Sequence, residues 1–185
     1  MCYNKGRIKA THPNTRRSPM NSIFHCISVR KYTSQPVEKE ALLQILRAGM
    51  QAPSACNQQP WEFYVVTDPA KIQALAAVTP YAGCAAGAPV VIVPVYRTEG
   101  LPAPAFAPID LSIALENMWL ETDALGLGGV WLGIAPAEQP MEAVHQLLAL
   151  PQGVRVFALF ALGHPAESRP QADRFDPSRI HFIEA

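Results

Sequence analysis

Charged residues are scarce in this sequence. Asp, Glu, Lys and Arg together make up 16% of the 185 residues, against roughly 25% in an average globular chain. Hydrophobic residues reach 49%, so the chain can bury a large core but has few charges with which to cover its surface. We therefore expect part of the apolar surface to be buried against a second copy, a partner or a cofactor.

The few charges are also unevenly distributed. Residues 1–19 hold five of the 15 basic residues and no acidic one, which leaves residues 20–185 with a net charge of −5. A body with excess acid lacks the clustered Lys and Arg that neutralise phosphates, so we expect no nucleic-acid partner. The pattern predicts a basic N-terminal extension over residues 1–19, followed by a single domain over residues 20–185.

Long apolar runs and paired cysteines are missing as well. No stretch of 18 apolar residues is present to cross a membrane, and the basic N-terminal segment lacks the apolar centre of a signal peptide. The four cysteines form no CxxC pair and do not have zinc-finger spacing. These absences predict a cytoplasmic protein with free thiols, without a membrane partner and without a metal site.

Several familiar catalytic motifs are absent. The sequence contains no GxxxxGK[ST], no HExxH and no GxSxG. GLGGVW at 126–131 resembles a dinucleotide-binding pattern, but it follows an expected helix and precedes a strand, which is the reverse order. The five histidines are spread over separate segments. If the chain is an enzyme, a bound cofactor is therefore expected to supply the difficult chemistry.

Hydrophobic periodicity predicts helices that alternate with short apolar strands. We expect helices at 38–51, 69–78, 111–125 and 138–150, and strands at 63–67, 90–96, 129–134 and 154–162. Asp68 and Asp110 are expected to cap the second and third helices, and Gly126 to end the third. Pro94 cannot donate a backbone hydrogen bond, so its strand should lie at a sheet edge or bulge there. This order fits a single α/β or α+β sandwich.

Two segments carry polar groups that packing alone does not explain. SVRKY at 28–32 follows a short apolar stretch, and PSACNQQPW at 53–61 gathers Ser, Asn and two Gln at the entrance to a strand. Such amide and hydroxyl groups can bind a planar heterocycle. The alternative is a loop that caps itself through Asx and Ser turns.

These segments resemble the nitroreductase family of FMN-dependent NAD(P)H oxidoreductases. Members typically show an Arg-x-Ser-x-Arg/Lys-x-aromatic segment and then APSxxNxQPW; this chain has SVRKY and APSACNQQPW. The resemblance continues in GLGGVWLGI, FALFALGHPAE and DRFDPSRIHF and covers roughly residues 20–183. It implies an α+β sandwich, with a central mixed, mostly antiparallel sheet flanked by helices. It also implies an intertwined homodimer with two FMN sites at the interface, each lined by both subunits.

The resemblance also assigns site residues, all of them cofactor-binding and none a catalytic acid or base. Ser28 and Arg30 would contact the ribityl-phosphate side or the N1/O2 edge of the flavin. The remaining assignments are Pro53, Ser54 and Asn57 to the isoalloxazine ring with Gln59 nearby, Trp131, Leu132 and Gly133 to the surroundings of N5, and Arg174, with Arg179, to the phosphate.

One departure from the family pattern concerns the phosphate. Where members commonly have basic residues before the serine, this chain has Cys26 and Ile27, so we expect Arg30 and Arg174 to hold the phosphate. The implied activity is ping-pong hydride transfer from NADH or NADPH, through flavin N5, to a nitroaromatic, a quinone or a similar small acceptor. A non-catalytic flavin-binding dimer remains an alternative, as does other flavin chemistry such as dehalogenation or flavin fragmentation.

Overall fold

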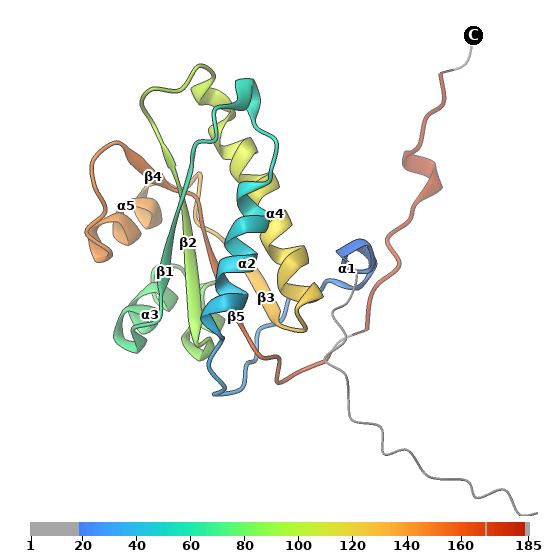
Figure 1. Cartoon of the computed structure of the whole chain (residues 1–185), viewed down its shortest axis with the longest axis horizontal. Helices are drawn as coiled ribbons and strands as arrows, with labels where there is room; N and C mark the ends of the chain where they lie inside the picture. Colours follow the sequence, from blue (N-terminus) through green and yellow to red (C-terminus); the bar gives the residue numbers. More distant parts are fainter. Residues whose placement is uncertain (1–18, 169, 184–185) are drawn as a thin grey trace, which may run out of the picture.

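One five-stranded sheet forms the centre of the computed structural model, which describes residues 19–168 and 170–183 (Figure 1). Apart from Pro19, the predicted N-terminal extension lies outside the described residues. The strands are β1 (Trp61–Val66), β2 (Val90–Arg97), β3 (Gly128–Gly133), β4 (Val154–Val156) and β5 (Ala158–Gly163). The helices are α1 (Pro19–His25), α2 (Lys39–Met50), α3 (Pro69–Ala76), α4 (Ala107–Ala124) and α5 (Glu138–Leu147). None of these helices is long and apolar enough to cross a membrane.

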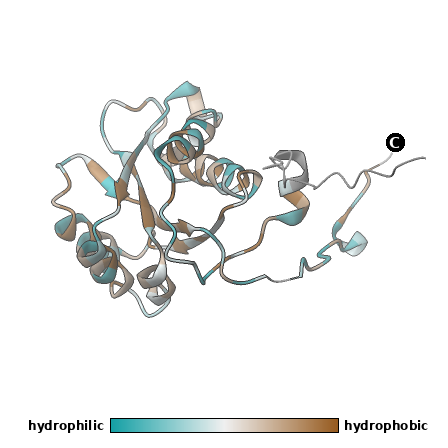
Figure 2. Cartoon of the chain, turned by 60° about the horizontal axis from the view of Figure 1, so that its bottom comes forward, coloured by the Kyte–Doolittle hydropathy of each residue, from teal (hydrophilic) through white to brown (hydrophobic). Residues whose placement is uncertain are grey.

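The strand order is β1-β2-β5-β3, with β4 also paired to β2, and every pair of named strands is antiparallel. One isolated parallel bridge joins Ser28 to Gly129, so the sheet is mixed and mostly antiparallel. Helices lie on both sides of the strongly hydrophobic strands (Figure 2). The predicted α+β sandwich is thus confirmed, whereas the homodimer stays a prediction.

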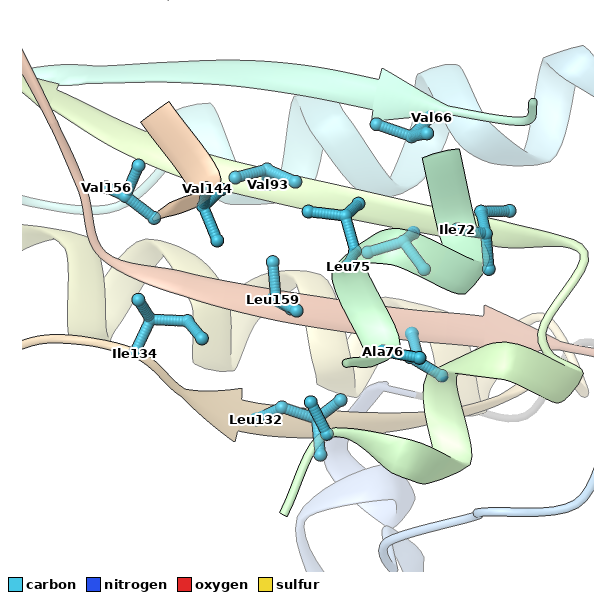
Figure 3. Close-up of a cluster of buried hydrophobic side chains, with 14 of the residues drawn as sticks. Val66, Ile72, Leu75, Ala76, Val93, Leu132, Ile134, Val144, Val156 and Leu159 are labelled. Carbon is cyan, nitrogen blue, oxygen red and sulfur yellow. The ribbon is translucent and has the colours of Figure 1, made fainter. Parts of the chain in front are cut away.

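Each face of the sheet has its own hydrophobic cluster. One cluster joins the sheet to α3 and α5 through residues such as Leu75, Val144 and Leu132 (Figure 3). The other joins it to α2 and α4. The two helices of this second layer approach closely at Gly49, where an added Cβ would meet Met118 Cγ at 2.7 Å. The inner face of α4 lies in this cluster, where Met118 is fully buried.

Pro94 lies in the middle of the sheet and not at its edge. Strand β2 is paired on one side with β1 and on the other with β4 and β5, so the edge alternative was wrong. A bulge is present at this point, but it lies in the strand opposite β2 and not in β2 itself. Ile92 pairs with Phe160 but Val95 pairs with Val156, so the strand opposite β2 carries one extra residue. Phe157 N–H donates to the Pro94 carbonyl at this point (3.0 Å), and the predicted strand at 154–162 is split there into β4 and β5.

Two of the three predicted helix ends are confirmed. The Asp68 carboxylate accepts the N–H of Ala70 at the start of α3 (2.8 Å), and Gly126 adopts a φ of +75° after α4. Asp110 is not the N-cap of α4, because the helix starts earlier, at Ala107, with Pro108 in its first turn. Proline is favoured there because its fixed φ suits a helix and its missing N–H has no helical acceptor to lose. The Asp110 carboxylate instead reaches the loop before β1.

Candidate functional site

The loop between α2 and β1 has an unusual backbone. Cys56, Asn57 and Gln59 have φ values of +51°, +52° and +44°, a region that residues other than glycine rarely adopt. Such conformations cost of the order of 1–3 kcal/mol each and are concentrated at active and ligand-binding sites. The loop is therefore held in a shape that its own sequence does not favour.

The side chains of this loop partly satisfy one another. Ser54 Oγ accepts the N–H of Gln59 (2.9 Å), and Gln59 Nε2 donates to Asn57 Oδ1 (3.1 Å). These are the local turns of the self-capping alternative. At the same time Asn57, Gln59 and Pro53 are exposed and Ser54 is half-buried. The loop thus caps itself and also presents polar groups to solvent on one surface.

The segment around SVRKY lies alongside β3, at the edge of the sheet. Val29 N–H donates to the Gly129 carbonyl (2.9 Å), and Gly128 has to be small because a Cβ there would meet Val29 at 2.7 Å. The Tyr32 hydroxyl donates to the Val29 carbonyl (2.6 Å) and lies 3.1 Å from the carbonyl of Ala161. Burial raises the pKa of Tyr32, so the hydroxyl stays a donor and holds the segment in place.

The segment after β5 runs back along SVRKY. Ala166 N–H donates to the Lys31 carbonyl (2.9 Å), and Arg30 N–H donates to Glu167 Oε1 (2.7 Å). This pairing brings Arg174 to Ser28 and Arg30, and the three residues line a cavity of about 250 Å³. Two guanidinium groups and a hydroxyl form a donor set that suits a phosphate.

Arg179 and Cys26 are not part of this donor set. The Arg179 guanidinium pairs with Asp176 inside its own short turn (Nε to Oδ2, 3.0 Å) and does not line the cavity. Burial, aided by the negative charges of Asp123 and Glu116, raises the pKa of Cys26 to about 12. Cys26 is therefore an uncharged thiol at neutral pH and does not replace the missing cation.

The three residues predicted at the end of β3 have three different environments. Trp131 packs on Phe157 with ring centroids 5.5 Å apart, and Leu132 is buried in the core cluster, so neither indole nor isobutyl group faces open space freely. Only Gly133 is exposed, with nothing within 4 Å of an added Cβ. Any contact of Leu132 with a ligand must therefore come from its backbone.

Gly133 opens onto a larger cavity, of about 550 Å³, that the sequence did not indicate. The lining is formed by Gly133–Ala137, by Val78–Tyr81 between α3 and the sheet, and by residues of α5. Among the residues that the structure describes, no charged side chain lines this cavity, and one of the lining residues is Tyr81, which is 85% exposed. The only available signals were the prolines in TPY (79–81) and IAP (134–136), which mark turns after a helix and a strand.

The predicted residues therefore fall into two groups. Ser28 pairs with Gly129 near the start of the edge strand β3, and Gly133 is the last residue of that strand. Four residues of extended chain place Gly129 and Gly133 about 13 Å apart. The loop at 54–59 lies at the other end of the molecule (Figure 1). It contacts Asp110 in the first turn of α4, whereas His25, next to SVRKY, contacts Asp123 in the last turn. Thirteen helical residues separate these contacts by about 20 Å.

Comparisons with known proteins concern the family and the fold of the chain. Residues 27–164 match the Nitroreductase family. A provisionally named NADH dehydrogenase/NAD(P)H nitroreductase of Methanothermobacter thermautotrophicus is 38% identical over 155 residues, covering 84% of this chain and 81% of that protein. The FMN reductase [NAD(P)H] of Bacillus subtilis is 30% identical, covering 85% and 70%.

A solved structure also matches over most of its length. The crystal structure of a provisionally named nitroreductase of Desulfovibrio desulfuricans in complex with FMN has a TM-score of 0.78 and 32% identity, covering 92% of this chain and 99% of that one. The family match spans most of the chain, and these relatives are at least 30% identical to it over more than two thirds of its length. The sheet, its two helical layers and these matches show that this chain belongs to the nitroreductase family.

Proposed function

We propose that this chain, an NAD(P)H-dependent flavin oxidoreductase with FMN as its cofactor, works by a ping-pong mechanism on a nitroaromatic, a quinone or a similar small acceptor. The observation that carries the proposal is the edge of β3. A cavity with Ser28, Arg30 and Arg174 lies near its start, and an uncharged cavity lies at Gly133. The relatives named as nitroreductase and FMN reductase, and the FMN complex of a related structure, support it.

The chemistry of the two cavities fits the two ends of FMN. A phosphate needs cations and hydrogen-bond donors, which Arg30, Arg174 and Ser28 supply. A flat, mostly apolar ring needs an uncharged slot, and the polar side chains that line the Gly133 cavity, Thr79, Tyr81 and Gln139, are all uncharged. The glycine leaves the backbone accessible, so a ring can approach without a side chain in its way.

Bound FMN would supply the hydride chemistry between NAD(P)H and the acceptor. The chain's own residues would bind and orient the cofactor. Arg30 and Arg174 would hold the phosphate end of FMN. The apolar lining at Gly133 would exclude water from the reacting face. No side chain is assigned as an acid or a base.

We further propose that a second copy of the chain completes each site. Within one chain, Asn57 and Ser54 lie by the end of α4 opposite to the end beside SVRKY, about 20 Å away along that helix, so in this proposal the ring contacts that the resemblance implies for them come from a partner subunit. Large apolar side chains are exposed where such a partner could pack. They include Phe106, Ile109 and Ile113 at the N-terminal half of α4, and Phe175, Phe182 and Ile183 in the C-terminal segment. An exposed set of this size favours an interface. The cytoplasmic location remains a prediction.

Spectroscopy of the purified protein tests the proposal. Stoichiometric FMN binding, loss of the 450 nm flavin absorbance on anaerobic addition of NADH or NADPH, and its return with a quinone are the expected results. Flavin that binds but is not reduced by either nicotinamide would favour the non-catalytic alternative. Sedimentation of the loaded protein is expected to give a dimer; a monomer that holds FMN tightly would contradict the shared site.

A further inference from the structure

Asp110 is a buried carboxylate that bonds outside its own helix. It lies in the first turn of α4 with 3% of its surface exposed. One oxygen, Oδ1, accepts the backbone N–H of Ala55 (2.9 Å), and the other, Oδ2, accepts Nε2 of Gln58 (2.6 Å). A single carboxylate therefore bonds to both ends of the short turn that carries Asn57.

Gln58 is held on all sides. Its Nε2 donates to Asp110 and to the carbonyl of Ala103 (2.9 Å), and its Oε1 accepts the N–H of Ala103 (3.0 Å). A primary amide has two N–H donors, and both are used here. The orientation of the amide is thus determined by its partners: the nitrogen must face Asp110 and the oxygen must face the N–H of Ala103.

A third group holds the backbone on the far side of Gln58. Arg97 NH2 donates to the carbonyls of Gln58 (3.2 Å) and Gln59 (2.9 Å). The residues on either side of Gln58, Asn57 and Gln59, both have positive φ values. Backbone in this region persists only when surrounding contacts outweigh its cost. The contacts of Gln58 with Asp110 and Ala103, together with Arg97, are the ones that meet this requirement.

We propose that Asp110, acting through Gln58, is a positioning residue for the flavin site: it holds the loop at 54–59 in the left-handed shape that presents Ser54 and Asn57. This inference rests on the proposed function for the identity of the ligand. Position 110 requires a carboxylate, because both of its oxygens act as acceptors. In one of its two orientations, the amide of an asparagine at 110 would turn its N–H groups toward the Gln58 nitrogen, which is itself a donor. In the other orientation it would turn these N–H groups toward the N–H of Ala55.

The test uses Asp110→Asn, Gln58→Glu and the double variant that exchanges the two groups. In the double variant an amide at 110 again faces a carboxylate at 58, and the N–H of Ala55 keeps its acceptor, but the carbonyl of Ala103 loses the donor that Gln58 supplied. Asp68→Asn is the matched control, since it makes the same chemical change at an exposed helix cap away from the loop. Amide hydrogen exchange of the peptide that spans residues 53–60 reports the loop in the apoprotein, and FMN titration reports the site.

In each single variant, the amide hydrogens of this peptide are expected to exchange about 10-fold faster or more, and the dissociation constant for FMN is expected to rise by a similar factor. A factor of this size corresponds to the loss of one well-formed buried hydrogen bond. The double variant is expected to recover part of both relative to Gln58→Glu, because the contact between positions 58 and 110 is restored while the bond to the Ala103 carbonyl is not, and the control is expected to change neither. Unaltered exchange in both single variants would overturn the proposal. Exchange that accelerates equally in β2 and β5 would also overturn it, because Asp110 would then stabilise the whole fold.

The two readouts separate the positioning role from the proposed function. If the wild type binds no flavin, the proposed function fails while the exchange data still decide whether Asp110 holds the loop. If the wild type binds flavin and the single variants loosen the loop without weakening FMN, the loop is held by Asp110 but does not position the ligand, and the inference is wrong.

Discussion

Replacing Arg174 by alanine should weaken the binding of FMN far more than that of riboflavin, which lacks the phosphate. Arg174 and Arg30 line the same cavity with Ser28, so the variant loses one of two cations. Hydrogen bonds to charged groups contribute about 1.5–3 kcal/mol. Arg174 is exposed to solvent, so the lower end of that range applies, which corresponds to about a 10-fold increase in the dissociation constant for FMN.

Flavin fluorescence titration of both ligands measures this effect, and Arg179→Ala is the matched control. The Arg179 guanidinium is paired with Asp176 and lies outside the cavity lining, so its removal should leave both affinities unchanged. The FMN affinity of the wild type should also fall with rising salt more steeply than that of Arg174→Ala. An equal loss for FMN and riboflavin would show that Arg174 does not contact the phosphate, and the assignment would be refuted.

Three further predictions concern single residues. Cys26→Arg should restore a cation beside the phosphate and tighten FMN, not riboflavin, by up to about 10-fold; equal titrations of parent and variant would contradict this. Asn57→Gly removes the side-chain amide, and glycine readily adopts the φ of +52° found there. FMN binding should therefore weaken by about 1–3 kcal/mol, while the melting temperature of the apoprotein should stay the same. A fall in stability without a change in FMN affinity would favour the self-capped loop. Tyr32→Phe takes the hydroxyl donor from two carbonyl groups, and denaturant unfolding should show a loss of about 1–2 kcal/mol. Tyr81→Phe, at an 85% exposed side chain, should show none.

Local chemistry was enough to predict several elements of the fold. Asp68 followed by Pro69 predicts a capped helix, and the cap is observed because its hydrogen bonds reach only two and three residues along the chain. Gly126 predicts a helix end for the same reason, since a positive φ is a property of one residue. Pro94 was understood only in part: its lack of a donor was evident, but whether it meets an edge or a bulge depends on the partner strand.

The errors concern side chains whose partners are distant in sequence. Asp110 looked like a helix cap because caps are local, yet its acceptor oxygens are used by Ala55 and Gln58, more than 50 residues away. The assignment of Leu132 to the flavin surroundings stays a prediction, but the alternation of the strand turns its side chain into the core, so only its backbone can face a ligand. The cavity beside Gly133 was not predicted, because it forms between two turns that no sequence pattern places side by side.

The order of elements along the chain left α/β and α+β open, and the family resemblance selected α+β. The sequence by itself also predicted the capped start of α3 and the polar loop before β1, because each depends on neighbours along the chain. The tertiary structure decided which of the candidate residues share a cavity. It brought Arg174 to Ser28 and Arg30 by pairing the segment after β5 with SVRKY, and it left Asn57 at the far end of α4. These distances are set by the packing of whole helices and strands, which no local pattern contains.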